Sequence, residues 1–470
     1  MTPSSNDSFA ATSPAPHVLR AARLPAWCSA DAPGLVDVWL VCGRIERITA
    51  HDAHGAYPAV PAHDAHGAIA LAHAPDPNIW HLHGAPVLPA LVEPHAHLDK
   101  AYTVHRAPPR GPGLLAAIEA SHADERHWSA ADLRTRAERA LRESLAAGVR
   151  LLRTHVSWFQ ADAPLAWAVY RELRAEWLGR VDLECVNISP LGLFEDAMLA
   201  ERIAATVAAT PGGVLGGFVH TTNHSELALR NLMAAAARHG LRVDLHADEE
   251  LAPHARGVAS AAKLAAEFGL HGRVACSHAC ALAVQDPHTA LTTLDAVARA
   301  GVSLISLPST NLLLQDATSG RTPRLRGITL VHEALARGIP VAFGSDNVQD
   351  AFNPVGRHDP VAALELAVLA AHIRPAFDMG SALVCNADAL GAGARITSLV
   401  GMPADLVIFP GSHPSAQAWP ADTHARVVLR GGRVVTTEMA GELAGETASE
   451  WAANSNTTAT ATAPAAGAAP

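Results

Sequence analysis

The segment Leu91–His97 reads LVEPHAH, a short apolar strand that runs into two histidines. Seven further short apolar segments follow it, and the stretches between them have the period of amphipathic helices. These segments are 150–155, 181–188, 214–220, 242–246, 274–278, 302–307 and 340–346. Strands that alternate with helices form parallel sheets with crossover helices. Eight strands over about 260 residues therefore predict an α/β fold, a (β/α)8 TIM-like barrel, whose usual length is about 250 residues.

Strand patterns of another kind lie on both sides of this region. The segments 36–42 and 45–48 flank Gly43 and predict a hairpin. Similar patterns recur at 404–409 and 427–435. Because chain termini often lie close together, we expect one small β-sandwich domain built from both chain ends. The predicted domains are a barrel at 91–390, a composite β-domain at 17–90 plus 391–443, and disordered tails at 1–16 and 444–470.

Composition limits the classes of function. Hydrophobic residues make up 49% of the 470 residues, so the chain can bury a large core. The net charge of −10 offers no basic field for nucleic acid or for a membrane surface. The first 16 residues have no apolar core of a secretory signal, and no apolar run reaches the length of a membrane helix. Six scattered cysteines suit reduced thiols, so we expect a cytoplasmic protein.

The predicted strand ends carry a recurring set of polar residues. The first strand ends in His95 and His97, the fifth in His246, the sixth in His278 and the eighth in Asp346. Residues i and i+2 of a strand share a face, so His95 and His97 can bind one ion from the same side. Neutral imidazoles with a carboxylate suit Zn²⁺ or Fe²⁺, and active sites of such barrels lie at these strand ends.

The chain has 27 histidines, and most need no functional explanation. His81 and His83 form a second HxH pattern, which we interpret as part of a strand in the small domain. The repeated segments 51–56 and 63–68 are typical of a variable loop.

His155 and His220 also end predicted barrel strands. For each of them, a role in lining the pore is at least as good an explanation as a role as metal ligand. Cys276 and Cys280 lack the paired CxxC spacing of a thiolate zinc site.

The strand-end segments, taken together, resemble those of the amidohydrolase superfamily, and specifically of its cytosine deaminase-like branch. The resemblance is carried by the patterns HxHLD, HxDE, SH and GSDN. They stand at 95–99, 246–249, 277–278 and 344–347 and are supported by 153–156, 311–315 and 326–329. The SHA and SDN segments are also similar to those of the N-isopropylammelide amidohydrolases. The similarity extends from about residue 18 to about residue 440, nearly the whole chain outside the tails.

The resemblance implies one catalytic divalent metal ion, Zn²⁺ or Fe²⁺, held by His95, His97, His246 and Asp346. It also implies that His278 hydrogen-bonds the attacking hydroxide. Binuclear relatives use a carboxylated lysine from the fourth strand. The chain has only two lysines, Lys100 and Lys263, and neither lies in the fourth strand at 214–220. A mononuclear site follows.

The resemblance also assigns roles in a hydrolytic deamination. Glu249, three residues after His246, would protonate a ring nitrogen, and Asp346 would pass the proton of water to the departing ammonia. Leu191 stands where cytosine deaminases carry a glutamine that contacts cytosine, so we expect weak binding of cytosine itself. Asn347 replaces a second acid of those enzymes. Phe352 stands where an aromatic residue closes the pocket.

The predicted function is therefore a metal-dependent aminohydrolase that releases ammonia from a small aminated nitrogen heterocycle. Two alternatives stay open. The same scaffold could hydrolyse a cyclic amide or an N-alkyl group on a triazine or pyrimidine, or the chain could be a non-catalytic relative without metal. No nucleic-acid or membrane partner is expected, and association into a homo-oligomer is left open.

Overall fold

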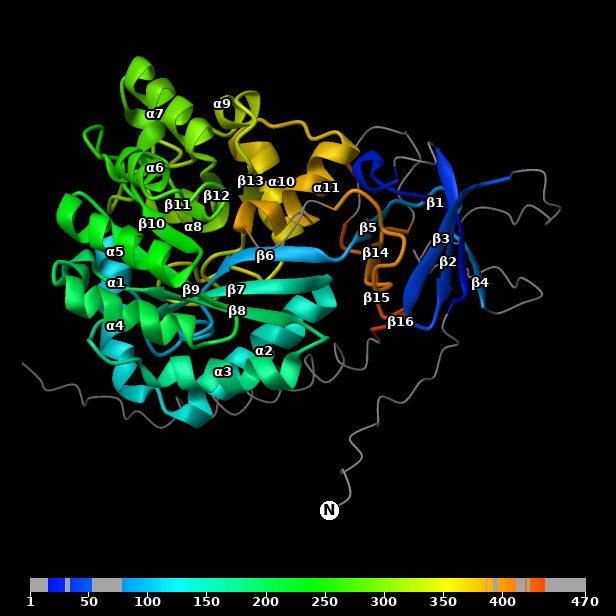
Figure 1. The fold of residues 1–470 in the computed structure, drawn as a ribbon, viewed down its shortest axis with the longest axis horizontal. Coiled ribbons are helices and arrows are strands. Elements are labelled where there is room, and N and C mark those ends of the chain that lie inside the picture. The colour runs from blue at the N-terminus through cyan, green and yellow to red at the C-terminus, as the bar shows by residue number, and fades with distance from the viewer. Residues whose placement is uncertain are drawn as a thin grey trace, which may run out of the picture.

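The computed structural model describes residues 16–29, 34–52, 78–385, 387–391, 396–410, 419–420 and 423–435. Figure 1 shows a large body from the middle of the chain and a smaller body of strands from the two ends. The predicted tail 444–470 lies outside the described residues, as does the tail 1–16 except for Pro16. Most of the loop that contains the repeated segments 51–56 and 63–68 also lies outside them.

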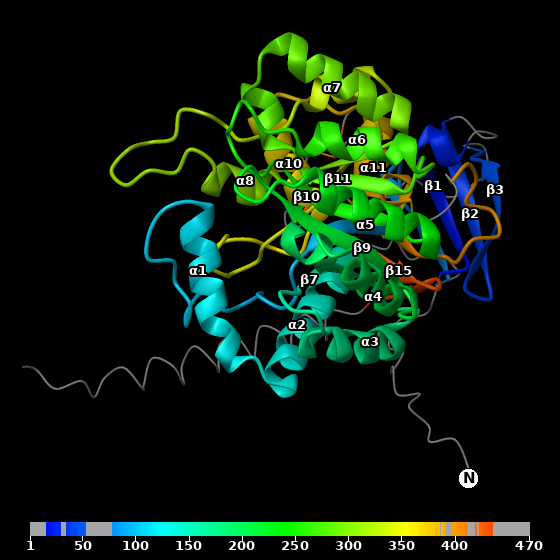
Figure 2. The same cartoon turned by 60° about the vertical axis from the view of Figure 1, so that its left-hand side comes forward.

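Eight parallel strands form the predicted barrel and follow one another in chain order around the sheet. They are β6 (Leu91–Ala96), β7 (Val149–Ser157), β8 (Asp182–Ile188), β9 (Gly213–Val219), β10 (Val243–Ala247), β11 (Val274–His278), β12 (Ser303–Ser306) and β13 (Val341–Phe343). Helices surround this sheet in both views (Figures 1 and 2). They are α1 (Leu114–Asp124), α2 (Ala130–Ala147), α3 (Leu165–Trp177), α4 (Ala197–Ala208), α5 (Glu226–His239), α6 (Gly257–Glu267), α7 (Pro287–Ala300), α8 (Pro308–Leu314), α9 (Val331–Ala336), α10 (Pro360–Ala370) and α11 (Phe377–Cys385).

Helix α2 shows how the sequence determines these elements. Ser129 caps its first turn by accepting a hydrogen bond from the amide of Asp132, and Gly148 ends it with a φ of 99°. Its buried residues Leu133, Ala137 and Leu141 recur every four positions and face the strands. The amphipathic period therefore sets which face packs on the sheet.

The barrel closes where the first and last strands meet. Ala96 and Asp346 form an isolated parallel bridge, and the amide of Asp346 donates to the carbonyl of His95 over 2.9 Å. Strand β13 ends at Phe343, so Asp346 lies just beyond the strand that was predicted to include it. The closure brings two predicted metal ligands to adjacent positions.

Two four-stranded sheets at the chain ends form the smaller body. One has the order β3–β2–β1–β4 and the other β16–β15–β14–β5. Their strands are β1 (Val18–Arg23), β2 (Leu35–Val41), β3 (Arg44–Ala50), β4 (Ile79–His81), β5 (Val87–Pro89), β14 (Leu406–Ile408), β15 (Val427–Arg430) and β16 (Arg433–Val434). Strand β5 pairs antiparallel with β14, which joins the two ends of the chain. The predicted hairpin is β2 and β3, and His81 ends β4 in the first sheet.

The floor of the barrel is closed by apolar residues and by a buried ion-pair network. Leu390 of a short 3-10 turn, η5 (Ala387–Leu390), packs with Val92, Ala275 and Ile305. Its carbonyl accepts a hydrogen bond from Arg153, which is fully buried. This floor leaves the opposite, carboxyl end of the strands for the site.

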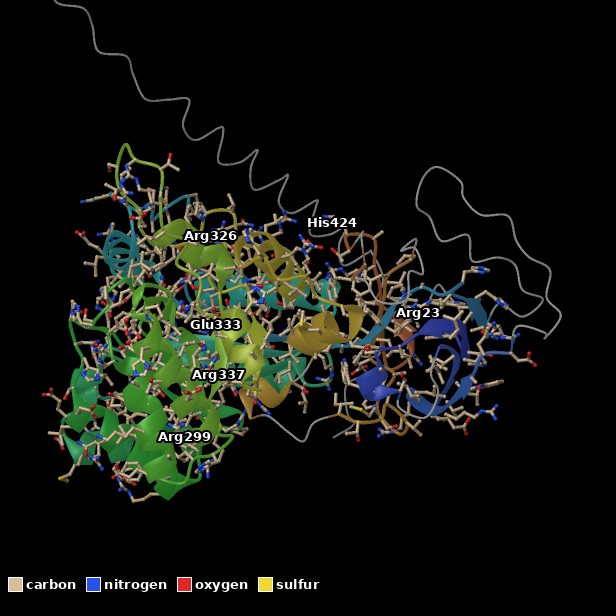
Figure 3. The ribbon with its side chains drawn as sticks, turned by 90° about the horizontal axis from the view of Figure 1, so that it is seen from above. Arg23, Arg299, Arg326, Glu333, Arg337 and His424 are labelled. Atoms are coloured by element: carbon tan, nitrogen blue, oxygen red, sulfur yellow. The ribbon has the colours of Figure 1, made fainter. Side chains whose placement is uncertain are left out.

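Charged side chains cover the outside of the barrel with both signs. Figure 3 labels Arg299, Arg326 and Arg337 on the barrel body together with Glu333. Arg337 pairs with Asp295 over 2.7 Å. Within the part of the chain that the structure describes, none of the helices combines the length and the apolar character needed to cross a lipid bilayer.

Candidate metal centre

Three imidazoles and one carboxylate meet at the carboxyl ends of the strands. Nε2 of His97 lies 3.3 Å from Nε2 of His95 and 3.3 Å from Nε2 of His246. Oδ1 of Asp346 lies 3.3 Å from Nε2 of His97 and 3.6 Å from Nε2 of His95. All four side chains are buried. The structure thus brings the four predicted metal ligands together at one point.

Four of the spacings between these donor atoms, 3.3–3.6 Å, fit one divalent ion. Zinc binds imidazole nitrogen and carboxylate oxygen at about 2.0–2.2 Å, so tetrahedral donors lie about 3.3–3.6 Å from one another. Both carboxylate oxygens of Asp346 are buried and have no hydrogen-bond partner among the residues that the structure describes. A buried carboxylate is costly unless something pairs with it. A cation among these four residues satisfies the carboxylate and all three inward-facing nitrogens.

Burial sets the protonation of these ligands. It lowers the pKa of His95 and His246 well below the usual value, and the neighbouring histidines lower it further. Burial acts to raise the pKa of Asp346, but the nearby His97 and His278 hold it below its usual value. Neutral imidazoles and an ionised carboxylate are the forms that bind a divalent ion.

The outer ring nitrogen of His97 has a backbone acceptor. Its Nδ1 lies 3.2 Å from the carbonyl of His155, which leaves the lone pair on Nε2, facing the cluster. Nζ of Lys100 is also 3.2 Å from this Nδ1, and it contacts Asp99 at 3.3 Å. The two contacts require opposite tautomers of His97, and the one in which Nδ1 donates to the carbonyl leaves a lone pair on Nε2 for a metal ion.

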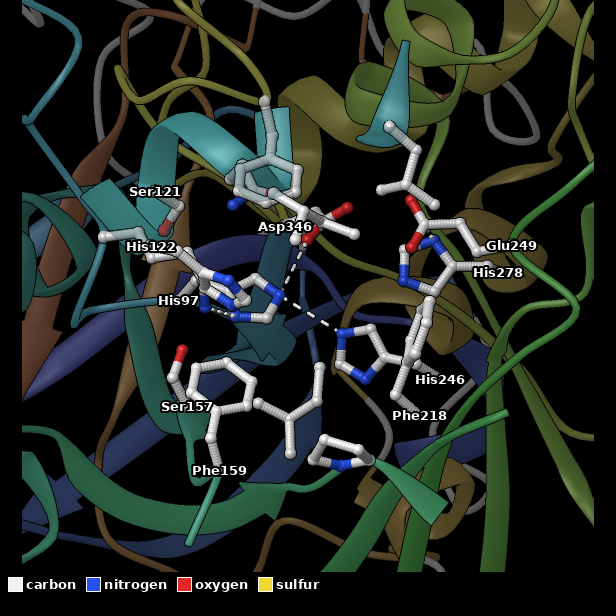
Figure 4. A pocket seen from close by; sticks show the side chains of 17 residues that line it. His97, Ser121, His122, Ser157, Phe159, Phe218, His246, Glu249, His278 and Asp346 are labelled. Carbon is white, nitrogen blue, oxygen red and sulfur yellow. Dashed lines mark hydrogen bonds and ion pairs between the residues drawn. The ribbon is translucent and has the colours of Figure 1, made fainter. Parts of the chain in front are cut away.

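His278 and Glu249 stand beside the cluster (Figure 4). Nδ1 of His278 lies 3.0 Å from the amide nitrogen of Asn311 and 3.5 Å from a carboxyl oxygen of Glu249. Burial lowers the pKa of His278 to about 4, so the ring is neutral. Since Nδ1 accepts from the Asn311 amide, the proton lies on Nε2. That atom is buried without a partner, so it can donate to a substrate or to water.

Glu249 holds a proton more strongly than an ordinary glutamate. Burial raises its pKa well above the usual value, and the charge of Asp346 raises it further. A raised pKa makes a carboxyl group better suited to give its proton to a reacting group. The backbone is also unusual here, with positive φ values at Asp248, His278 and Asp346 (55°, 70° and 60°). Such conformations recur at functional sites.

These groups open onto one cavity of about 200 Å³ (Figure 4). Phe159, Phe218 and Phe352 form aromatic walls, as a planar ring would need. Glu249 and His278 lie on one side of the cavity, Ser121, His122 and Ser157 lie on the other, and Asp346 lies between them.

The three predicted substrate residues have different places. Asn347 and Phe352 line the cavity, and the amide of Asn347 donates to Asp350 over 2.7 Å. Leu191 is fully buried in the hydrophobic core and is not among the residues that line this cavity. Ile188 and Pro190 line it instead, so this part of the wall is apolar.

The other histidines that end strands lie outside the ligand cluster. The ring of His155 stacks on that of His95, with centroids 3.8 Å apart. Within the described part of the chain, neither ring nitrogen of His155 has a hydrogen-bond partner. Nε2 of His220 lies 3.4 Å from Glu250. Cys276 and Cys280 are both fully buried.

Several cavity residues are not evident from the sequence motifs. Helix α1 contributes Leu114, Ile118, Ser121 and His122, whose spacing of four, three and one places them on one helix face. That periodicity is a signal that the sequence offers. Asn311 lies in one of the motifs that carry the resemblance, but nothing in its spacing shows that it contacts His278.

Comparison with known proteins shows the family of the chain. Residues 130–436 match the family described as "Amidohydrolase family". A pterin deaminase of Rhizobium rhizogenes is 38% identical over 358 residues, which is 74% of this chain and 80% of that protein.

Solved structures give the same fold. A 5-methylcytosine deaminase from Klebsiella pneumoniae bound to phosphonocytosine has a TM-score of 0.71 at 25% identity, covering 89% of this chain and 98% of that one. An N-isopropylammelide isopropylaminohydrolase from Burkholderia multivorans has a TM-score of 0.66 at 22% identity, covering 89% and 97%.

Proposed function

The chain belongs to the amidohydrolase family and is a hydrolase of carbon–nitrogen bonds, and we propose that it releases ammonia from an aminated nitrogen heterocycle. The observation that carries the proposal is the cluster of His95, His97, His246 and Asp346 at the base of an aromatic cavity, with Glu249 beside it. We propose one divalent ion, Zn²⁺ or Fe²⁺, at this cluster. Such an ion, when bound, makes hydroxide available near neutral pH.

The chain's own residues supply the proton transfers. Glu249, whose pKa burial raises, donates its proton to the ring nitrogen next to the carbon under attack. His278 donates from Nε2 to the oxygen that attacks this carbon. Asp346 accepts the proton of water and delivers it to the leaving amine, and its free oxygen gives it the capacity to do so.

The aromatic walls hold the ring in place. Phe159, Phe218 and Phe352 cover its faces, and the apolar residues Ile188 and Pro190 exclude water. We propose a pterin-like bicyclic ring as the first substrate to test, because the pterin deaminase relative is 38% identical across most of both chains. Without a polar side chain at Ile188 and Pro190, this wall offers cytosine no partner for its ring edge.

The proposal is tested with the purified, zinc-loaded chain against a panel of pterin, 5-methylcytosine, cytosine and N-isopropylammelide. Ammonia and product mass are measured together. Ammonia release with pterin as the best substrate supports the proposal. Release of isopropylamine, or ring opening, would assign the chain to hydrolysis of an N-alkyl group or of a cyclic amide. No turnover of any ring by fully loaded protein contradicts it.

A further inference from the structure

A chain of buried polar contacts lies beneath the ligand cluster and has no part in the proton transfers. Nδ1 of His95 lies 2.9 Å from Oγ of Ser277, which donates to Oδ1 of Asp244 over 3.0 Å. All three residues are fully buried. We infer that Ser277 and Asp244 are positioning residues that hold His95 as a metal ligand, an inference that rests on the proposed metal centre.

The direction of these hydrogen bonds follows from chemistry. An ionised carboxylate only accepts hydrogen bonds, so the hydroxyl proton of Ser277 is given to Asp244. Oγ of Ser277 then has a lone pair to accept the Nδ1 proton of His95. This fixes the tautomer of His95, and its Nε2 presents a lone pair to the cluster.

Asp244 is itself held in one orientation. Nη1 of Arg153 donates to Oδ2 of Asp244 over 2.8 Å, and Nε and Nη2 of the same guanidinium donate to Glu184 over 3.0 and 2.8 Å. The side chain of Arg153 is fully buried. Arg153 and Ser277 each contact a different oxygen of Asp244, so its carboxylate cannot turn.

Among the three histidine ligands, His95 is the one whose outer ring nitrogen is oriented by a chain of side-chain hydrogen bonds. The outer nitrogen of His97 faces a backbone carbonyl, and Nδ1 of His246 has no hydrogen-bond partner in the described ranges of the chain. A backbone contact cannot be removed by substitution. The relay Asp244–Ser277–His95 can be removed, which makes its contribution measurable.

The same atoms suggest a competing interpretation. Donor atoms of His95, His155 and Asp244 lie within 4.8 Å of one another, as they would around a second ion. The guanidinium of Arg153, however, already contacts Asp244 at 2.8 Å. A second cation there would face this permanent charge, so the relay is favoured.

The test is the affinity for Zn²⁺, measured by competition with a chromophoric chelator, together with the number of ions bound per chain. Loss of such an outer contact typically weakens metal affinity about 10–100-fold, which is the expectation for Ser277→Ala. Ser277→Thr keeps the hydroxyl and should restore most of the affinity. Ser306→Ala is the control, since Ser306 is equally buried in the neighbouring strand β12.

A double-mutant cycle separates the relay from general packing. Asp244→Asn combined with Ser277→Ala should bind zinc no more weakly than the worse single variant, because both changes cut the same chain of hydrogen bonds. Unchanged affinity in Ser277→Ala, or an equal loss in Ser306→Ala, overturns the inference and leaves the metal centre intact. Two ions per wild-type chain would also overturn it, and no zinc binding by wild type would overturn the metal centre itself.

Discussion

Glu249 is the residue at which the proposed chemistry is most sensitive to a small change. Glu249→Gln keeps the size of the side chain but removes the acidic proton. We expect turnover to fall about 10²–10⁴-fold, the usual contribution of one proton transfer. Steady-state ammonia release is measured at saturating substrate, with zinc content determined on the same sample, and the zinc content should not change.

The matched control is the next residue. Glu250 accepts hydrogen bonds from the backbone and hydroxyl of Thr221 and does not line the cavity. Glu250→Gln should therefore keep turnover within the range of wild type. Equal losses in the two variants would mean that turnover depends on this acidic segment as a whole, and that Glu249 has no specific role.

Single residues also show what the sequence could and could not predict. His95, His97, His246 and Asp346 end strands of a recognisable barrel, so their meeting follows from the fold. Leu191 was expected at the substrate because of a resemblance alone. A resemblance does not determine which residue of a turn faces the cavity, and here Ile188 and Pro190 do. The contact of Ser277 with His95 joins two strands 182 positions apart, and no local pattern carries that information.

At the scale of elements, Gly216 in strand β9 shows how tightly the barrel wall is packed. A Cβ at this position would lie 2.4 Å from a methyl group of Val186 and 2.5 Å from the carbonyl of Asn187. Gly216→Ala should lower the free energy of unfolding by about 1–3 kcal/mol, the usual effect of overpacking. Urea unfolding measures the change.

Gly192 provides the control for this substitution. A methyl group added there would meet open space, with no atom of a surrounding residue within 4 Å, and the backbone has no positive φ. Gly192→Ala should leave the unfolding midpoint unchanged or slightly higher, since alanine restricts the unfolded chain. If both variants behaved alike, close packing of the strands around Gly216 would not be the cause.

The bounds of an element are predicted well where the element is long and its apolar period is strong. They are predicted less well where the element is short. The long helix α2 lies in one of the stretches whose apolar spacing predicts an amphipathic helix. Strand β13 has only three residues and is shorter than predicted. Its end is set by the closing bridge between Ala96 and Asp346, which is a contact between the first and last strands.

At the scale of the whole molecule, Arg426 connects the end sheets to the barrel. It donates to both carboxylate oxygens of Asp359 over 3.0 and 2.8 Å and to the carbonyl of Ala147 over 2.9 Å. Its side chain is 8% exposed. Arg426→Ala should cost about 2 kcal/mol of unfolding free energy, because it leaves partly buried acceptors without a partner.

An exposed ion pair serves as the comparison. Arg202 and Asp162 are 3.3 Å apart, but their side chains are 57% and 95% exposed. Arg202→Ala should change the unfolding free energy by less than about 1 kcal/mol. A larger effect for Arg202→Ala than for Arg426→Ala in urea unfolding would contradict the role given to Arg426.

Metal removal should affect the stability of the whole chain as well as its activity. An ion that binds only the folded state stabilises it, by about 2.7 kcal/mol at a free concentration 100 times the dissociation constant. Dialysis against a chelator should therefore lower the melting temperature and abolish ammonia release, and added zinc should restore both. An unchanged melting temperature with full loss of bound metal would contradict a metal held among buried ligands.

The overall architecture is accessible from sequence because strand–helix alternation repeats along the chain until the barrel is complete. The pairing of the chain ends, seen as β5 beside β14, could be expected from matching strand patterns on both sides of the barrel. The contacts that join the two bodies, such as that of Arg426 with Asp359, depend on packing between distant segments and could not be predicted.

Anomalous X-ray diffraction from crystals of the zinc-loaded chain, collected at the zinc absorption edge, tests the central claim most directly. One strong peak should lie within bonding distance of Nε2 of His95, Nε2 of His97, Nε2 of His246 and a carboxylate oxygen of Asp346. A loaded crystal with its peak elsewhere, or with no peak among these four side chains, would contradict the metal centre on which the proposed reaction depends.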